Sequence, residues 1–144
     1  HRTGNEVFRK MFGNKDYRLI AGRIKFLMIN TNAIEYDYSE PVPDFDFLET
    51  EVKKDSALFD RTIVCMHAAP YSEQFNNNVA KPFNHYMQFY PGLMFCLYGH
   101  GHHTEEHDIF ENGTIYYEVA SAEKREYRIF TITPKGYSNE VISF

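Results

Sequence analysis

Four of the seven histidines of this chain lie within CLYGHGHHTEEH, at positions 96–107. Gly99 and Gly101 flank His100 and allow positive φ angles around it. A turn there can direct His100 and His102 toward two points a few ångströms apart. Neutral imidazole binds zinc, iron and manganese, and paired metal ions in hydrolases lie about 3.5–4 Å apart. The spacing predicts a catalytic metal site, with a structural zinc site and a polar loop as the alternatives.

A further histidine follows a second apolar run. TIVCM at 62–66 and LMFCLYG at 93–99 are the most apolar stretches, and they lead directly into His67 and His100. If both stretches are strands of one parallel sheet, both histidines lie at its carboxyl edge, where α/β proteins place their sites. We therefore expect His67 to share a site with His100. A hydrogen-bonded structural histidine is the alternative for His67.

The other histidines and the two cysteines are weaker candidates for metal ligands. His103 and His107 run into an acidic segment and are expected to support the site or face solvent. His85 lies in a predicted helix and is expected to be structural. Cys65 and Cys96 each lie inside an apolar run, which is typical of buried thiols rather than of a four-cysteine zinc site.

The elements that must position these side chains follow from hydrophobic periodicity and from turn residues. We expect helices at 4–13, from about 45 to 56, and within 79–90 after Pro82. We expect strands at 16–20, 23–31, 61–67 and 93–98, followed by alternating polar and apolar residues to the end. Asp46 and Glu49 are consistent with a capping box. Asn112-Gly113 predicts a hairpin turn, which also accounts for the sequon formed with Thr114.

Strands that alternate with helices predict an α/β fold with a parallel sheet, and the alternating tail predicts a β-meander that makes the sheet mixed. With 144 residues, 43% of them hydrophobic, the chain is long enough for one domain with a core. The net charge is −5 and the basic residues are scattered, so we expect no nucleic-acid surface. No apolar stretch is long enough to span a membrane.

Two sequence blocks carry a family resemblance. VCMHAAPY at 64–71, followed by LYGHGHH at 97–103, resembles the last two metal-binding blocks of the calcineurin-like metallophosphoesterases. The opening at 1–13 resembles the segment that begins at that family's Gly-Asn-His block, and 23–32 resembles its next core strand. The resemblance spans essentially all of residues 1–144 and corresponds to the C-terminal half of the family's domain. We expect a single partial domain from a longer protein, since the chain opens on His1 and reads as mid-domain sequence.

The resemblance implies the C-terminal half of a β-sandwich flanked by helices, with a dinuclear centre of manganese, zinc or iron. His67 and His100 would bind one metal ion and His102 the other. The missing N-terminal half would supply the bridging Asp and the remaining ligands. His1 would be the histidine that acts near the leaving group. The family usually has Asp or Glu after that histidine, whereas Arg2 follows here.

The implied function is metal-dependent hydrolysis of a phosphoester. Tyr71 and Asn76 follow His67 closely and are candidate substrate-binding residues, because loops at a sheet's carboxyl edge carry such contacts. The isolated chain is expected to be inactive and metal-poor, since it holds too few ligands for two ions. The alternative function is a non-catalytic metal-binding or scaffold module with a degenerate site.

Overall fold

The computed structural model describes residues 2–33 and 41–144, and side chains from residue 6 onward within those ranges. Two short 3₁₀ helices, η1 (Asn77–Val79) and η2 (Ala122–Lys124), accompany the main elements. The main elements in chain order are α1 (Arg2–Phe12), β1 (Tyr17–Ala21), β2 (Ile24–Ile29), α2 (Phe45–Lys53), β3 (Arg61–Met66), α3 (Ala80–Gln88), β4 (Leu93–Tyr98), β5 (Glu106–His107), β6 (Tyr116–Glu118), β7 (Glu126–Thr133) and β8 (Gly136–Ser143).

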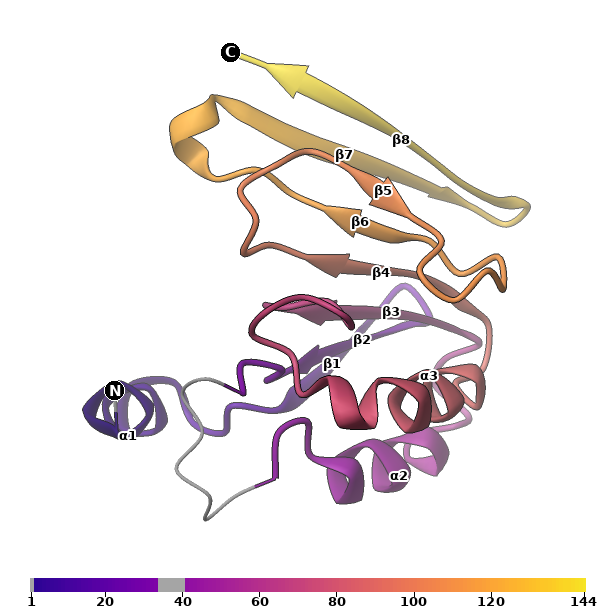
Figure 1. Cartoon of the computed structure of the whole chain (residues 1–144). Helices are drawn as coiled ribbons and strands as arrows, with labels where there is room; N and C mark the ends of the chain where they lie inside the picture. Colours follow the sequence, from indigo (N-terminus) through magenta and orange to yellow (C-terminus); the bar gives the residue numbers. More distant parts are fainter. Residues whose placement is uncertain (1, 34–40) are drawn as a thin grey trace.

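The strands form one mixed sheet of six and one separate hairpin (Figure 1). The large sheet has the order β1-β2-β3-β4-β6-β5; β2, β3, β4 and β6 are parallel, and β1 and β5 are antiparallel edge strands. The C-terminal segment with alternating polar and apolar residues is thus divided between the two sheets. Its first part joins the large sheet, and β7 and β8 pair only with each other. The expected α/β fold with a mixed sheet is confirmed.

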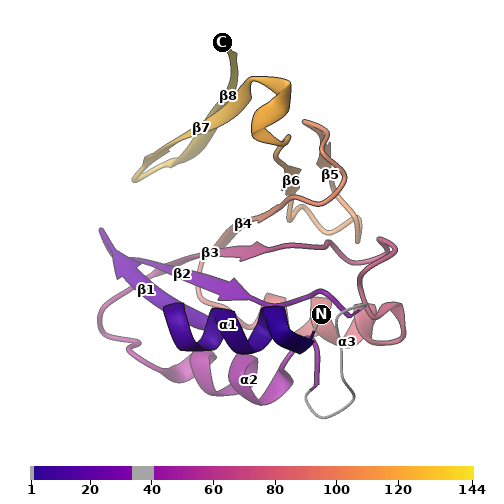
Figure 2. The same ribbon diagram turned by 90° about the vertical axis from the view of Figure 1, so that its left-hand side faces the viewer.

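Both faces of the large sheet are covered near its centre, which explains why β3 and β4 are apolar throughout. Side chains alternate between the faces. Val64 and Cys96 pack with helices α2 and α3, whereas Ile63 and Phe95 face the β7–β8 hairpin. Figure 2 shows the resulting order of layers: helices, large sheet, hairpin.

Aromatic rings join the hairpin to the large sheet. The ring of Phe95 stacks on Phe130 of β7 with the centroids 4.4 Å apart. The hydroxyl oxygens of Tyr117 and Tyr137 lie 3.0 Å apart, within hydrogen-bond distance. This second layer is compatible with the sandwich that the family resemblance implied.

Helix α2 has a different N-cap and a different last residue from those expected. Its N-cap is Asp44, whose Oδ1 accepts a hydrogen bond from the Phe47 amide at 3.0 Å, so the predicted capping box at Asp46 is wrong. The helix ends at Lys53 rather than near residue 56. The buried Nζ of Lys25 donates to the carbonyl oxygens of Glu51 and Lys54 at 2.5 and 2.7 Å, which satisfies the last turn.

The other predicted elements agree closely with the structure. Helices α1 and α3 and strands β1 to β4 lie within a few residues of their predicted bounds. Asn112-Gly113 lies in the loop that joins the antiparallel strands β5 and β6, where Asp108 accepts both backbone amides. Across the described ranges, no helix has the length and apolar character needed to cross a membrane.

Candidate metal centre

Strands β3 and β4 bring His67 and His100 together at the carboxyl edge of the sheet. The strands are parallel neighbours, with Cys65 opposite Leu97. Just beyond them, the Gly99 amide donates to the His67 carbonyl oxygen at 3.1 Å. The two imidazole rings lie edge to face with centroids 5.1 Å apart. The two apolar strands therefore deliver two imidazoles to one place.

The turn after β4 has an unusual backbone. His100 and His102 adopt φ angles of 70° and 60°, a left-handed conformation that histidine tolerates better than most residues but that still costs free energy. Contrary to expectation, neither Gly99 nor Gly101 has a positive φ angle. A Cβ on Gly101 would overlap the Glu118 carboxylate, so this glycine provides space rather than backbone freedom.

The sequence also made predictions for His102, His85 and His1. His102 is exposed, and in the part of the chain that the structure describes its ring makes no contact with those of His67 and His100. His85 on α3 packs edge-on against Phe89, with centroids 4.8 Å apart. His1, the candidate leaving-group residue, lies outside the described residues.

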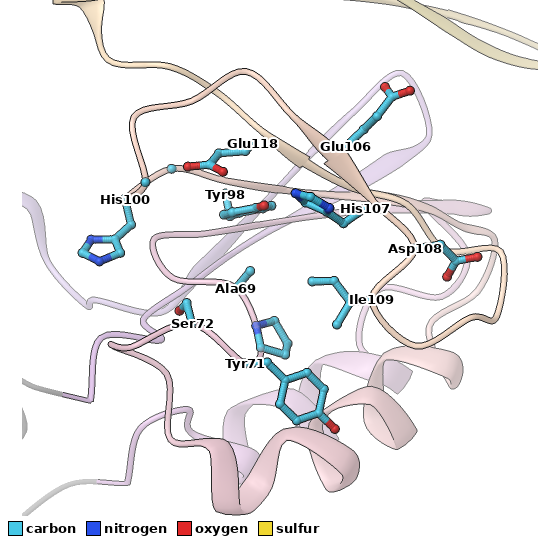
Figure 3. A pocket seen from close by; sticks show the side chains of 13 residues that line it. Ala69, Tyr71, Ser72, Tyr98, His100, Glu106, His107, Asp108, Ile109 and Glu118 are labelled. Atoms are coloured by element: carbon cyan, nitrogen blue, oxygen red, sulfur yellow. The ribbon is translucent and has the colours of Figure 1, made fainter.

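A cavity of about 570 Å³ opens beside His100 (Figure 3). Tyr71 forms part of its rim, with a half-exposed ring and a strained φ of 69°. The Tyr71 amide donates to Asn77 Oδ1 at 2.8 Å, and its ring lies 5.6 Å from that of Phe110. The other candidate substrate residue, Asn76, is not part of the cavity wall, and neither is His67.

Glu118 is the functional candidate that sequence reasoning missed. It ends β6 opposite Tyr98 of β4, it is only 5% exposed, and it lines the same cavity as His100. Burial, reinforced by the Glu118 carboxylate, raises the pKa of Tyr98 well above its usual value. In the sequence, an acidic residue at the end of an alternating strand does not indicate a functional site. Only the parallel pairing of β6 with β4 brings Glu118 to the carboxyl edge of the sheet.

A second group of donors lies on the β5–β6 ribbon. Glu105, His107 and Glu118 each offer a ligand atom within 4.8 Å of the others. His107 Nε2 lies 2.8 Å from Glu105 Oε2. His107 was expected to support the site or face solvent, and the structure gives it a place in this Glu105–His107–Glu118 cluster.

No protein-family model and no curated protein matches the sequence. Among solved structures, the chain is similar to a Staphylococcus aureus "Putative 5'-Nucleotidase" in complex with α-ketoglutarate, with a TM-score of 0.51 and 13% identity. The similarity covers 92% of this chain and 29% of that protein, so the chain spans less than a third of its length. At this identity the likeness is one of fold. It is compatible with the metallophosphoesterase-like half-domain expected from the motifs.

Proposed function

We propose that the chain is the C-terminal half of a metal-dependent phosphoester hydrolase of the calcineurin-like type. The observation that supports this most directly is the convergence of His67 and His100 at the ends of two adjacent parallel strands. The fold likeness to a chain described as a 5'-nucleotidase supports the same class. His67 is exposed and His100 is partly exposed, so both imidazoles are accessible to a ligand.

The separation of the two rings supports a shared metal ion. Two imidazoles bound to one tetrahedral ion at about 2.0–2.1 Å place their ring centroids roughly 5 Å apart. The observed separation is 5.1 Å. We propose that His67 and His100 bind one ion of manganese, zinc or iron and that His102 binds the second. When bound, such ions polarise phosphoryl oxygens and lower the pKa of a water molecule.

The chain's own residues would bind and orient the substrate around these imidazoles. Tyr71 lies on the cavity rim and can contact the part of the substrate beyond the phosphate. Asn77 fixes the Tyr71 backbone and thereby positions its ring. Asn76 remains a second candidate for substrate contact from the same loop. His1 is proposed to stabilise or protonate the leaving oxygen.

The rest of the domain is needed for activity. Two ions require roughly eight ligands, including positions kept for water and substrate. The proposed ligands of this chain are three imidazoles, and among the described residues none is identified as the bridging carboxylate that would hold two cations close against their repulsion. We propose that the upstream half supplies this bridging Asp and the other ligands. The isolated chain is therefore expected to have negligible activity.

The test compares the parent protein with the isolated chain. An aryl phosphate and its diester are assayed with added Mn²⁺ or Zn²⁺. We expect metal-dependent hydrolysis by the parent alone, and a loss of at least about 100-fold in His100→Ala and His102→Ala, because each removes a direct metal ligand. His85→Ala is the matched control, since His85 packs on Phe89 away from the centre.

Two results would contradict the proposal in different ways. A parent that binds no metal and hydrolyses neither ester would favour the alternative, a scaffold module with a degenerate site. Strong activity of the isolated chain would show that its ligand set is complete and that the half-domain assignment is wrong.

A further inference from the structure

Three donor side chains share one face of the β5–β6 ribbon. The Glu118 amide donates to the Glu105 carbonyl oxygen at 2.9 Å, which places these residues opposite each other across the two strands. His107 is two positions from Glu105 and therefore points to the same face. Figure 3 shows the His107 ring directed toward Tyr98 and Glu118, whereas Glu106 points away. The Glu105–His107–Glu118 cluster is thus a product of strand register.

The cluster has an excess of negative charge. Like charges opposite each other on antiparallel strands repel, and a buried carboxylate needs compensation. Glu118 is 5% exposed; its Oε1 accepts a hydrogen bond from the His103 amide at 3.5 Å, and the Tyr98 hydroxyl is a second, uncharged partner of the carboxylate. Within the described ranges no lysine or arginine forms an ion pair with Glu118. His107 contacts Glu105 and is the only imidazole in the cluster.

The donor set matches a divalent transition-metal ion. One imidazole nitrogen and two carboxylate oxygens within 4.8 Å of one another can surround a single ion. Imidazole favours zinc, and carboxylates are also suited to manganese. Three protein ligands leave a position for water. The missing Cβ of Gly101 makes room for the Glu118 carboxylate, so the cluster abuts the turn that carries His100.

We infer that Glu105, His107 and Glu118 bind one Zn²⁺ or Mn²⁺ ion at a site that uses none of the proposed catalytic histidines. The ion joins β5, β6 and the His100 turn through Glu118. It neutralises the two carboxylates and holds the wall of the cavity in place. This site does not depend on the phosphoester hydrolase assignment, because its ligands all come from the ribbon.

The test begins with the 144-residue chain carrying His67→Ala, His100→Ala and His102→Ala, produced without a histidine tag. Zn²⁺ and Mn²⁺ are titrated separately by calorimetry. We expect one equivalent of at least one of the two ions to bind this triple variant. Adding His107→Asn or Glu105→Gln should weaken the binding at least about tenfold. Both side chains are about half exposed, 47% and 52%, so these changes should leave the fold intact. His85→Asn serves as the matched histidine control.

A structural readout completes the test. Adding the ion that binds should raise the melting temperature of the triple variant but not that of its His107→Asn derivative. X-ray absorption of the zinc- or manganese-loaded triple variant should show one nitrogen and two carboxylate oxygens from protein. A triple variant that binds neither ion would overturn the inference, because a protonated His107 between the carboxylates would then account for the cluster. Binding that His107→Asn and Glu105→Gln both leave unchanged would also overturn it.

Discussion

Two glycines have nearly the same backbone conformation in different surroundings. Gly92 and Gly22 have φ angles of 54° and 56°. A Cβ on Gly92 would overlap the carbonyl oxygen of Asp60, whereas a Cβ on Gly22 would meet no atom within 4 Å. The Gly92 carbonyl oxygen also accepts a hydrogen bond from the Thr62 amide at 3.0 Å. This bond holds the segment that enters β4 beside β3.

Gly92→Ala is therefore expected to destabilise the chain more than Gly22→Ala does. Both substitutions cost about 1–2 kcal/mol of left-handed strain. Only Gly92→Ala must also displace backbone atoms, which adds roughly 1–3 kcal/mol. Urea unfolding of the two variants measures the difference in the free energy of unfolding. Equal losses would show that the Asp60 carbonyl moves freely.

At the scale of elements, the end of α2 is held by a buried lysine from β2. Lys25 is fully buried, and its Nζ donates to the Glu51 and Lys54 carbonyl oxygens. Its ammonium also lies 3.6 Å from Glu51 Oε2 and 4.4 Å from the Phe59 ring centroid. Burial lowers the pKa of Lys25, and the Glu51 carboxylate opposes that shift. The contact fixes the helix layer against the sheet.

Lys25→Met should cost about 3–5 kcal/mol of stability, because it leaves the buried Glu51 carboxylate and two helix carbonyls without this donor. Lys54→Met is the matched control. Lys54 contacts Glu51 Oε1 at 3.5 Å but is half exposed, so its loss should cost less than about 1 kcal/mol. Chemical denaturation of both variants tests this contrast. Similar small losses would mean that Arg18, 3.0 Å from Glu51 Oε2, suffices to hold that carboxylate.

At the scale of the whole molecule, one helix presents its apolar side chains to solvent. Val7, Phe8, Met11 and Phe12 of α1 are between 39% and 69% exposed. In the described part of the chain, the rings of Phe8 and Phe12 contact each other at a tilt, with the centroids 5.1 Å apart. An amphipathic helix gains stability by burying such a stripe. The proposed upstream half of the domain is the natural cover for this surface.

We predict that the upstream half, produced together with this chain, forms a complex with it. Phe12→Lys should weaken that complex at least about tenfold, because Phe12 is the most exposed ring on the stripe. Phe89→Lys is the control, since Phe89 is similarly exposed, at 56%, but lies at the C-cap of α3. Analytical ultracentrifugation or calorimetry measures the affinity. Equal effects of the two substitutions would place the interface elsewhere.

The sequence alone was sufficient to predict the local elements and the ends of the two central strands. Strands covered on both faces must be apolar, so β3 and β4 were evident, together with the histidines that follow them. Helical periodicity likewise predicted α1 and α3. The N-cap of α2 was missed, because Asp44 and Asp46 are both plausible caps and only the path of the preceding chain decides between them.

Tertiary structure alone decided what lies beside the histidines. The tail shows alternation, but alternation does not say which strand it pairs with or in which direction. Only the parallel pairing of β6 with β4 brings Glu118 against Gly101, and only the β5–β6 register brings Glu105 and His107 to Glu118. Periodicity is a property of neighbouring residues, whereas these contacts join segments that meet because they share a core. The sequence therefore predicted the two histidines that meet, and the fold revealed the carboxylates around them.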